Sequence, residues 1–146
     1  MIIDLRTLKR YGQDRKDFFF EYSGENSEIE IPYGQIVYPI KINGSVELTG
    51  NHSAYVSGEI SVTLKGECTR CLKETQKDFV FDFAEQLEEN AEQGYSVEKD
   101  RIDLTKIVLD AIVMELPLNF LCKEDCKGIC LKCGVNLNDQ DCKCEK

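Results

Sequence analysis

Histidine is almost absent from this sequence, because His52 is the only one among 146 residues. Catalysis by a Ser-His-Asp or Cys-His arrangement would have to use this side chain, and its position between two strand-like segments predicts a surface loop. The chain also has no Gly-Lys-Ser or Gly-x-Gly-x-x-Gly phosphate-binding loop, and neither half of the zinc-deaminase motif. The sequence therefore predicts a protein that is not an enzyme and has no small-molecule substrate.

Long apolar runs are missing as well. No stretch approaches the roughly 18 consecutive apolar residues that a membrane-spanning helix needs, so we expect no contact with a membrane. The first six residues, Met-Ile-Ile-Asp-Leu-Arg, carry charge, and no apolar signal-peptide core follows them. The expected location is the cytoplasm.

Positive charge is scarce, since 18 Lys and Arg face 27 Asp and Glu and the formal net charge is −9. This balance argues against a general nucleic-acid-binding surface and favours a basic protein partner. The first twenty residues hold the only cationic cluster of any length, which includes Arg6, Lys9 and Arg10. Two interpretations of it remain open, a solvated helical turn or loop and a phosphate contact.

Cysteine, by contrast, is abundant. Eight cysteines are present, two in the middle of the chain and six near its end: Cys68, Cys71, Cys122, Cys126, Cys130, Cys133, Cys142 and Cys144. The spacing Cys130-x2-Cys133 lets two thiolates reach one tetrahedral ion, and Gly134 relieves the tight backbone behind the second ligand. The pattern predicts one or two structural zinc ions with these eight residues as candidate ligands.

Three other uses of the thiols fit the sequence less well. Disulfides need an oxidising compartment, to which nothing in the sequence directs the chain. Iron-sulfur clusters also use four cysteines, but the spacings match neither the bacterial nor the plant ferredoxin pattern. A redox Cys-x-x-Cys normally lies where a strand enters a helix, whereas Cys68 and Cys71 lie between two strand-like segments.

Two arrangements of the eight thiols remain open. In the first, the four thiols nearest the C-terminus form one site, because their two close pairs flank a loop short enough to fold back. The other four then form a second site, with the apolar segment 117–121 leading the chain back to the hairpin. In the competing arrangement Cys126 joins the C-terminal site, which leaves Cys122, Cys68 and Cys71 without metal.

Strand patterns fill the first half of the sequence. Apolar residues alternate with polar ones over 56–64 and again over 79–83, on either side of Cys68 and Cys71, which predicts a hairpin with a zinc knuckle at its tip. The same parity runs through 36–48 across Asn43-Gly44, which slightly favours a bulge in one long strand over a hairpin turn. The acidic segment 85–100 is expected to be a solvated linker.

One helix is expected after that linker. Asp103 caps it, Leu104, Ile107, Val108, Ala111 and Ile112 form an apolar stripe, and Pro117 follows its end. Leu109, Val113, Met114 and Leu116 widen that stripe, so burial on more than one side is expected. The fold class is therefore α+β, a mainly antiparallel β-sheet or partly open barrel with one buried helix and a C-terminal zinc-binding tail. Residues 1–121 are expected to form the sheet-plus-helix domain, and residues 122–146 a cysteine-rich zinc-binding appendage packed on it.

Three parts of the sequence resemble the YceD family of bacterial domains. They are Cys-Thr-Arg-Cys-Leu at 68–72, Glu-Leu-Pro-Leu at 115–118, and the tail from Cys122 through Cys130-Leu-Lys-Cys133 to Asn138. The resemblance covers most of the chain in order and is most specific in the two cysteine regions. It departs from the family at Leu131, because the family's tail often has proline in this part of the knuckle.

The resemblance implies a non-catalytic ribosome-biogenesis factor. Family members are named for the accumulation of large-subunit ribosomal RNA, and their genes often adjoin that of a small zinc-ribbon ribosomal protein. The implied role is to support accumulation or processing of 23S ribosomal RNA, with a ribosomal protein or a large-subunit precursor particle as partner.

The residues by themselves leave other possibilities open. They also describe a zinc-stapled protein-interaction or regulatory module unrelated to ribosomes, and they do not decide whether RNA is contacted directly. Arg70, on the zinc knuckle of the hairpin, is the first candidate for an RNA or partner contact, and Arg6, Lys9 and Arg10 are further candidates. The other interpretation of Arg70 is a solvent-facing side chain at a hairpin tip.

Overall fold

A computed structural model describes residues 1–24 and 29–144, which divide into two compact units. The first, here called the sheet unit, consists of Met1–Ile29, Tyr38–Val62 and Phe79–Leu116. The second, here called the cysteine unit, consists of Glu30–Val37, Thr63–Asp78 and Pro117–Lys146. The expected domain boundary between residues 121 and 122 stays a prediction, and residues 145–146 of the expected tail lie outside the described part.

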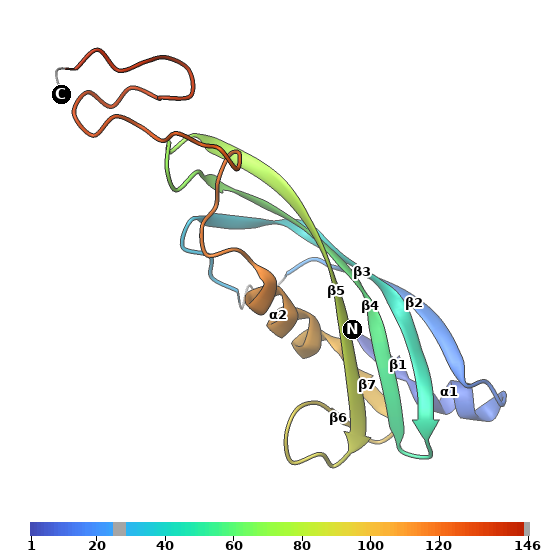
Figure 1. Cartoon of the computed structure of the whole chain (residues 1–146). Helices are drawn as coiled ribbons and strands as arrows, with labels where there is room; N and C mark the ends of the chain where they lie inside the picture. The colour runs from blue at the N-terminus through green and yellow to red at the C-terminus, as the bar shows by residue number, and fades with distance from the viewer. Residues whose placement is uncertain (25–28, 145–146) are drawn as a thin grey trace. The chain divides into compact units, whose positions relative to one another are not determined.

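Five strands form one sheet in the order β2-β3-β4-β5-β6 (Figure 1). Their bounds are Arg15–Tyr22 for β2, Gly34–Gly50 for β3, Ser53–Glu67 for β4, Glu74–Glu89 for β5 and Ser96–Val97 for β6. β2 pairs antiparallel with β3, β3 and β4 are joined by two residues only, and β6 is parallel to β5. The prediction of a mainly antiparallel sheet is confirmed. The alternative of a partly open barrel is not confirmed, because the strand order β2-β3-β4-β5-β6 shows no closure of the sheet among the described residues.

β3 is one long strand through Asn43-Gly44, as the favoured interpretation expected, and neither a hairpin turn nor a bulge interrupts its pairing with β2 there. Asn43 pairs with Phe19 and Gly44 with Phe18 in an unbroken antiparallel register. A Cβ added to Gly44 would stand 2.8 Å from the Cα of Gly58 on β4, and one added to Gly58 would stand 2.8 Å from the Cα of Gly44. The glycine is therefore needed for close approach of two backbones and not for a turn.

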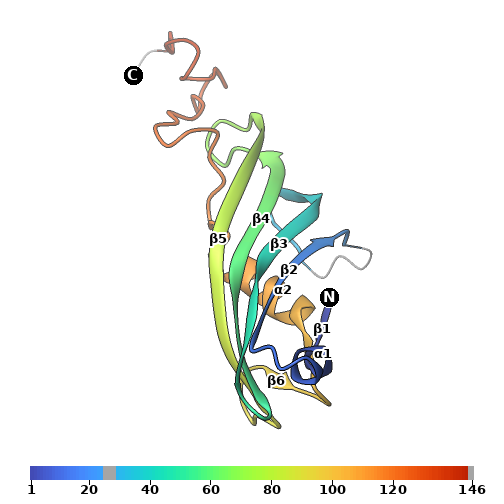
Figure 2. The same ribbon diagram turned by 90° about the vertical axis from the view of Figure 1, so that its right-hand side faces the viewer.

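Helix α2 (Leu104–Glu115) lies along one face of the sheet in both views (Figures 1 and 2). The carboxylate of Asp103 accepts a hydrogen bond from the backbone N–H of Thr105 at 2.9 Å, as expected for its cap. The buried side chains of the helix are Leu104, Ile107, Val108, Leu109 and Ile112. Val113 and Met114 are 60% and 84% exposed, so the expectation of burial on more than one side is wrong for these two residues.

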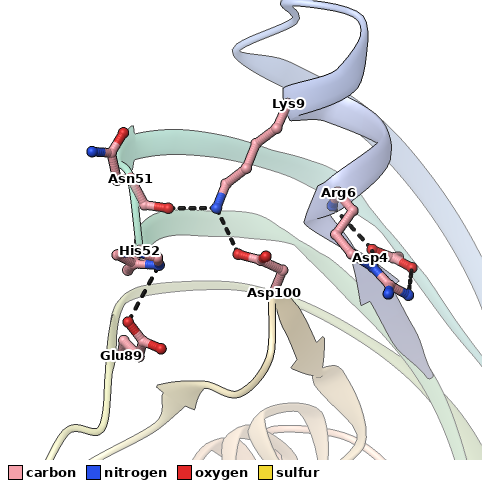
Figure 3. A network of polar contacts seen from close by, with 7 residues as sticks. All are labelled: Asp4, Arg6, Lys9, Asn51, His52, Glu89 and Asp100. Carbon is pink, nitrogen blue, oxygen red and sulfur yellow. Dashed lines mark hydrogen bonds and ion pairs between the residues drawn. The ribbon is translucent and has the colours of Figure 1, made fainter.

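The N-terminal segment also folds into the sheet unit. β1 (Ile2–Asp4) pairs antiparallel with β7 (Arg101–Asp103), and helix α1 (Leu5–Arg10) follows with Leu5 and Leu8 buried. Lys9 Nζ lies 2.6 Å from the Asp100 carboxylate and also donates to the carbonyl of Asn51 (Figure 3). Lys9 is therefore anchored to the chain around residue 100, while the choice between a solvated turn and a phosphate contact for the rest of the cationic segment stays open.

The acidic segment 85–100 is not a linker over its whole length. β5 continues to Glu89, Leu87 is 1% exposed, and the His52 Nδ1 atom lies 3.2 Å from a Glu89 carboxylate oxygen (Figure 3). Strand β6 follows at Ser96–Val97. The linker interpretation is wrong for residues 85–89, because Leu87 keeps the alternation of Phe79, Phe81 and Phe83, a period-two pattern that the glutamates nearby obscure.

The core of the sheet unit is mostly aliphatic, with Phe83 as a buried aromatic side chain. Buried residues come from β3 and β4, from β1 and α1, and from β7 and α2, among them Ile40, Ile42, Val56, Ile60, Ile3, Leu8, Ile102, Ile107 and Ile112. In the described part of the chain, no helix has both the length and the apolar character needed to cross a membrane.

Candidate metal centres

The first group of four thiols forms in the cysteine unit, where the connection between β4 and β5 meets the chain after Pro117. It consists of Cys68, Cys71, Cys122 and Cys126, whose sulfur atoms all lie within 4.8 Å of one another. The sulfurs of Cys68 and Cys126 are 3.6 Å apart, as are those of Cys71 and Cys122. Three of the four residues are buried, so this set is called the buried group.

The second group of four thiols closes a loop at the end of the chain. It consists of Cys130, Cys133, Cys142 and Cys144, whose sulfurs also lie within 4.8 Å of one another. The sulfur of Cys142 is 3.2 Å from that of Cys130 and 3.7 Å from that of Cys133. None of these residues is buried and Cys133 is exposed, so this set is called the exposed group.

The two Cys-x-x-Cys segments share one backbone conformation. The residue after the second cysteine donates its N–H to the carbonyl of the first, Leu72 to Cys68 at 2.9 Å and Gly134 to Cys130 at 2.8 Å. That residue is left-handed in both knuckles, with φ of 62° at Leu72 and 75° at Gly134. The sequence explains the glycine, but it does not explain the leucine, for which this conformation is strained.

Backbone N–H groups of the second knuckle point at a sulfur. The N–H of Lys132 donates to Cys130 Sγ at 3.4 Å. Hydrogen bonds from the backbone of Cys133, from the side chain of Cys142 and from the backbone of Lys132 lower the pKa of Cys130 to about 6. Hydrogen bonds with Cys142 and Cys133 raise the pKa of Cys144 to about 12. These shifts favour the thiolate at Cys130 and the protonated thiol at Cys144, and binding of a cation would release the remaining protons.

The buried group likewise contains thiols with a lowered pKa and a thiol with a raised pKa. Burial raises the pKa of Cys68, but hydrogen bonds from the backbone of Cys71, Cys122 and Arg70 outweigh it and lower that pKa to about 6. Burial and hydrogen bonds with Cys71 and Cys126 raise the pKa of Cys122 to about 12. Because thiolates are the metal-binding form of cysteine, each group already favours that form at one or more of its ligands.

The distances suit one tetrahedral ion in each group. With a Zn–S bond of about 2.3 Å, the sulfurs of a tetrahedral site stand about 3.8 Å apart. The four sulfur pairs given above span 3.2–3.7 Å. A disulfide would need about 2.05 Å, and an iron-sulfur cluster would place several metal ions among its thiolates and spread them farther apart. The donor set therefore fits zinc, while metal binding itself stays a prediction.

The apolar segment before Cys122 holds the buried group in place. Phe120 is 1% exposed and stacks on Tyr33, with ring centroids 5.2 Å apart and planes 6° from parallel. The Tyr33 hydroxyl donates to the carbonyl of Pro117 at 2.8 Å. The carbonyl of Phe120 accepts the N–H of Thr69 from the knuckle at 2.7 Å. The first knuckle and the tail are thus tied together by bonds that need no metal.

Asn138 is a residue that sequence reasoning missed. Its side-chain NH2 donates to Cys126 Sγ at 3.4 Å, and its side-chain oxygen accepts the N–H of Lys127 at 2.9 Å. The bond from Asn138 is the largest cause of a lowered pKa at Cys126. Asn138 lies in the loop of the exposed group yet supports a thiol of the buried group. The tail motif that resembles the YceD family ends at Asn138, but nothing in the sequence indicates that this side chain contacts a cysteine.

The four residues that the sequence proposed as RNA or partner contacts lie in both units and make different contacts. In the cysteine unit, Arg70 Nη1 donates to the carbonyl of Cys126 at 3.0 Å. In the sheet unit, Arg6 forms two hydrogen bonds with the Asp4 carboxylate, and Lys9 holds Asp100 (Figure 3). Arg10 lies in the last turn of α1. Arg70 thus supports a candidate ligand segment, and its role as a partner contact stays a prediction.

Comparison with known proteins gives a family match and several similar relatives. A family model described as "Large ribosomal RNA subunit accumulation protein YceD" matches residues 56–146, which include both thiol groups. A protein of Arabidopsis thaliana named "Large ribosomal RNA subunit accumulation protein YCED homolog 1, chloroplastic" is 43% identical over 47 residues, which are 32% of this chain and 15% of that protein. An uncharacterized protein of Mycobacterium leprae is 30% identical over 110 residues, which are 68% of this chain and 49% of that protein.

The chain spans only part of the length of the relatives that it matches. The chain spans 15% of the Arabidopsis protein and about half of the Mycobacterium leprae protein. An uncharacterized protein of Mycobacterium tuberculosis is 33% identical over 92 residues, 56% of this chain and 44% of that protein. No solved structure matches the chain.

Proposed function

This chain belongs to the YceD family, and from that membership we propose that it is a non-catalytic ribosome-biogenesis factor supporting accumulation or processing of large-subunit (23S) ribosomal RNA. The observation that carries the proposal is the family match over residues 56–146. Curated relatives in Arabidopsis thaliana and Zea mays are named for large ribosomal RNA subunit accumulation, which supports it. The cytoplasm is the location that goes with this role.

Zinc has a structural role in this proposal. Each group of four thiols holds one ion, which supplies a closed tetrahedral link between chain segments. The eight ligands are the cysteines of the buried and the exposed group. Such a site has no coordination position left for water or a substrate, and this supports a role in binding instead of catalysis.

The partner in this proposal is a ribosomal protein or a large-subunit precursor particle. The chain has a formal charge of −9, and thiolate ligation of two zinc ions would add −4. An acidic surface attracts basic proteins and repels acidic ones. Contact through protein is therefore the main mode proposed.

A deletion strain tests this function. We expect loss of mature 23S ribosomal RNA and accumulation of large-subunit precursors on a sucrose gradient when the gene is removed. The wild-type chain and a His52→Ala control should restore the profile, because His52 belongs to neither thiol group. A Cys68→Ser, Cys71→Ser variant should fail to restore it. A normal ribosomal RNA profile in the deletion strain would instead favour a zinc-stapled interaction module unrelated to ribosomes.

A further inference from the structure

The sheet unit contains an open pocket of about 780 Å³ that neither the thiol groups nor the family match explains. Its walls come from β1 and α1, from the end of β5, from the segment 94–101 and from the start of α2. The side chains around it include Arg6, Lys99, Arg101 and Lys106. A pocket of this size is in the range that accommodates a nucleotide-sized ligand.

Positive charge collects around this pocket in a chain that is otherwise acidic. Four cations line it against two carboxylates, those of Glu98 and Asp103, whereas the whole chain carries −9. Among the described residues, Lys99, Arg101 and Lys106 have no side-chain hydrogen bond and no ion pair within 4.0 Å. Asp4 is bound by Arg6 and interacts electrostatically with Arg101, so Lys99 and Lys106 contribute most to a local field that attracts anions.

The turn that carries Lys99 is fixed in a costly conformation. Lys99 and Asp100 have φ of 50° and 59°, and Glu98 and Arg101 exchange backbone hydrogen bonds at 3.0 and 2.9 Å. Tight turns with two such residues normally use Asn-Gly or Asp-Gly. Here Asp100 is held by the side chain of Lys9 at 2.6 Å and by the N–H of Leu5 at 2.8 Å. The turn therefore sets the position of the Lys99 backbone at the pocket before any ligand arrives.

An aromatic ring completes the pocket. Tyr95 lines it, and its hydroxyl donates to the Asp110 carboxylate of α2 at 2.8 Å. The hydrogen bond to Asp110 fixes the orientation of the ring, and burial together with that bond raises the pKa of Tyr95 to about 12. Ile2, which is 59% exposed, adds an apolar side chain to the same lining.

We propose that this pocket binds an unpaired nucleotide of RNA, with its phosphate among Lys99, Arg101 and Lys106 and its base against Tyr95. Cations that follow a backbone and an aromatic ring on which a base stacks are the parts from which single-strand binding sites are built. An acidic peptide would use the cations but would gain nothing from the ring. That the RNA belongs to a ribosomal precursor rests on the function proposed above; the binding itself does not.

The test uses the full chain and a fluorescent single-stranded RNA of mixed sequence in an anisotropy titration. The pocket variant is Lys99→Asn, Arg101→Gln, Lys106→Gln, in which asparagine replaces Lys99 because it tolerates a positive φ. The control variant, Arg15→Gln, Lys16→Gln, Lys41→Gln, removes the same charge from exposed positions on β2 and β3. Unchanged melting curves show that both variants fold.

Wild type and the control variant should bind, while the pocket variant should bind at least tenfold more weakly. One neutralised phosphate of a single strand corresponds to a slope of about −0.7 in log K against log salt, and the pocket variant should lose that slope. Tyr95→Leu should weaken binding about fivefold or more through lost stacking, whereas Tyr95→Phe should retain most of it.

Three results would overturn the inference. They are equal RNA affinity of the pocket and control variants, no measurable binding by wild type at 50 mM salt, and binding of polyglutamate that matches RNA and ignores Tyr95→Leu. The last result would make the pocket a site for acidic peptides. The assay contains no ribosomal component, so its outcome and that of the deletion strain can be read separately.

Discussion

Arg70 offers the sharpest test of how the cysteine unit is built. Its guanidinium donates to the carbonyl of Cys126 at 3.0 Å, and a Cβ on Gly128 would touch the Arg70 carbonyl at 3.4 Å. A hydrogen bond from a charged donor contributes about 1.5–3 kcal/mol when it is shielded from water. Because Arg70 is exposed, about 1 kcal/mol is the appropriate value here. Removal of the bond should therefore weaken retention of metal by the buried group about fivefold, since about 1.4 kcal/mol corresponds to a factor of ten.

The assay is a chelator competition on the zinc-loaded chain, followed by the absorbance of the chelator complex. Arg70→Ala should release the metal of the buried group at about fivefold lower chelator concentration, with the second equivalent unchanged. Lys73→Ala is the matched control, because it removes an exposed cation from the same hairpin. Arg70→Lys should fall between the two, since a lysine keeps the charge but lacks the planar fork.

The opposite outcome has a definite meaning. If Arg70→Ala and Lys73→Ala retain metal equally well, the bond to Cys126 does not stabilise the site and the argument above is refuted. Loss of 23S ribosomal RNA in a strain that carries Arg70→Ala would then identify Arg70 as a contact for the partner. If metal retention and ribosomal RNA both fall, the structural role is sufficient to explain the defect.

Three further predictions concern the metal content and the stability of the fold. Cys130→Ser with Cys133→Ser should lose one of two zinc equivalents by elemental analysis, and a chain that still binds two would refute the grouping of the thiols. Phe120→Ala should lower the free energy of unfolding by about 3–5 kcal/mol in a denaturant titration, and a loss below about 1 kcal/mol would show that the stack on Tyr33 is dispensable. Asp103→Ala should cost about 1 kcal/mol and lower the melting temperature by about 2–4 °C through loss of the α2 cap, whereas Asp103→Asn should retain most of it.

Local patterns predicted the regular elements well. The alternation over 56–64 became β4, and the cap of α2 formed at Asp103 as expected. The pairing of β1 with β7 could not be predicted in this way, because it joins residues about a hundred positions apart through a three-residue strand whose sequence has no distinctive period. The wide apolar face expected of α2 failed at Met114 for a related reason. A helix's own spacing shows which residues could be buried, but not whether any segment covers them.

For the thiol groups, too, local spacing predicted one part of the arrangement and left another part open. Spacing alone indicated that the four most C-terminal cysteines belong together, because their loop is short. It could not decide where Cys126 belongs, since Cys126 is about equally close in sequence to Cys122 and Cys130. The structure places its sulfur 3.6 Å from that of Cys68, and the stacked pair Tyr33–Phe120 accounts for this arrangement. That contact joins segments nearly ninety residues apart, so no local pattern could indicate it.

A difference in how their turns are held explains why only the second of the two Cys-x-x-Cys knuckles was easy to recognise in the sequence. A left-handed conformation costs a residue such as Leu72 about 1–2 kcal/mol, which Gly134 avoids. The second knuckle needs its glycine because its main-chain bonds, such as Cys130 N–H to Val135, join near neighbours only. The first knuckle is held from outside by Phe120 and by the tail, so its shape does not depend on the residue at position 72. Leucine is tolerated there because contacts with distant residues impose the turn. A search for the motif Cys-x-x-Cys-Gly therefore finds only those knuckles whose turn is formed by neighbouring residues alone.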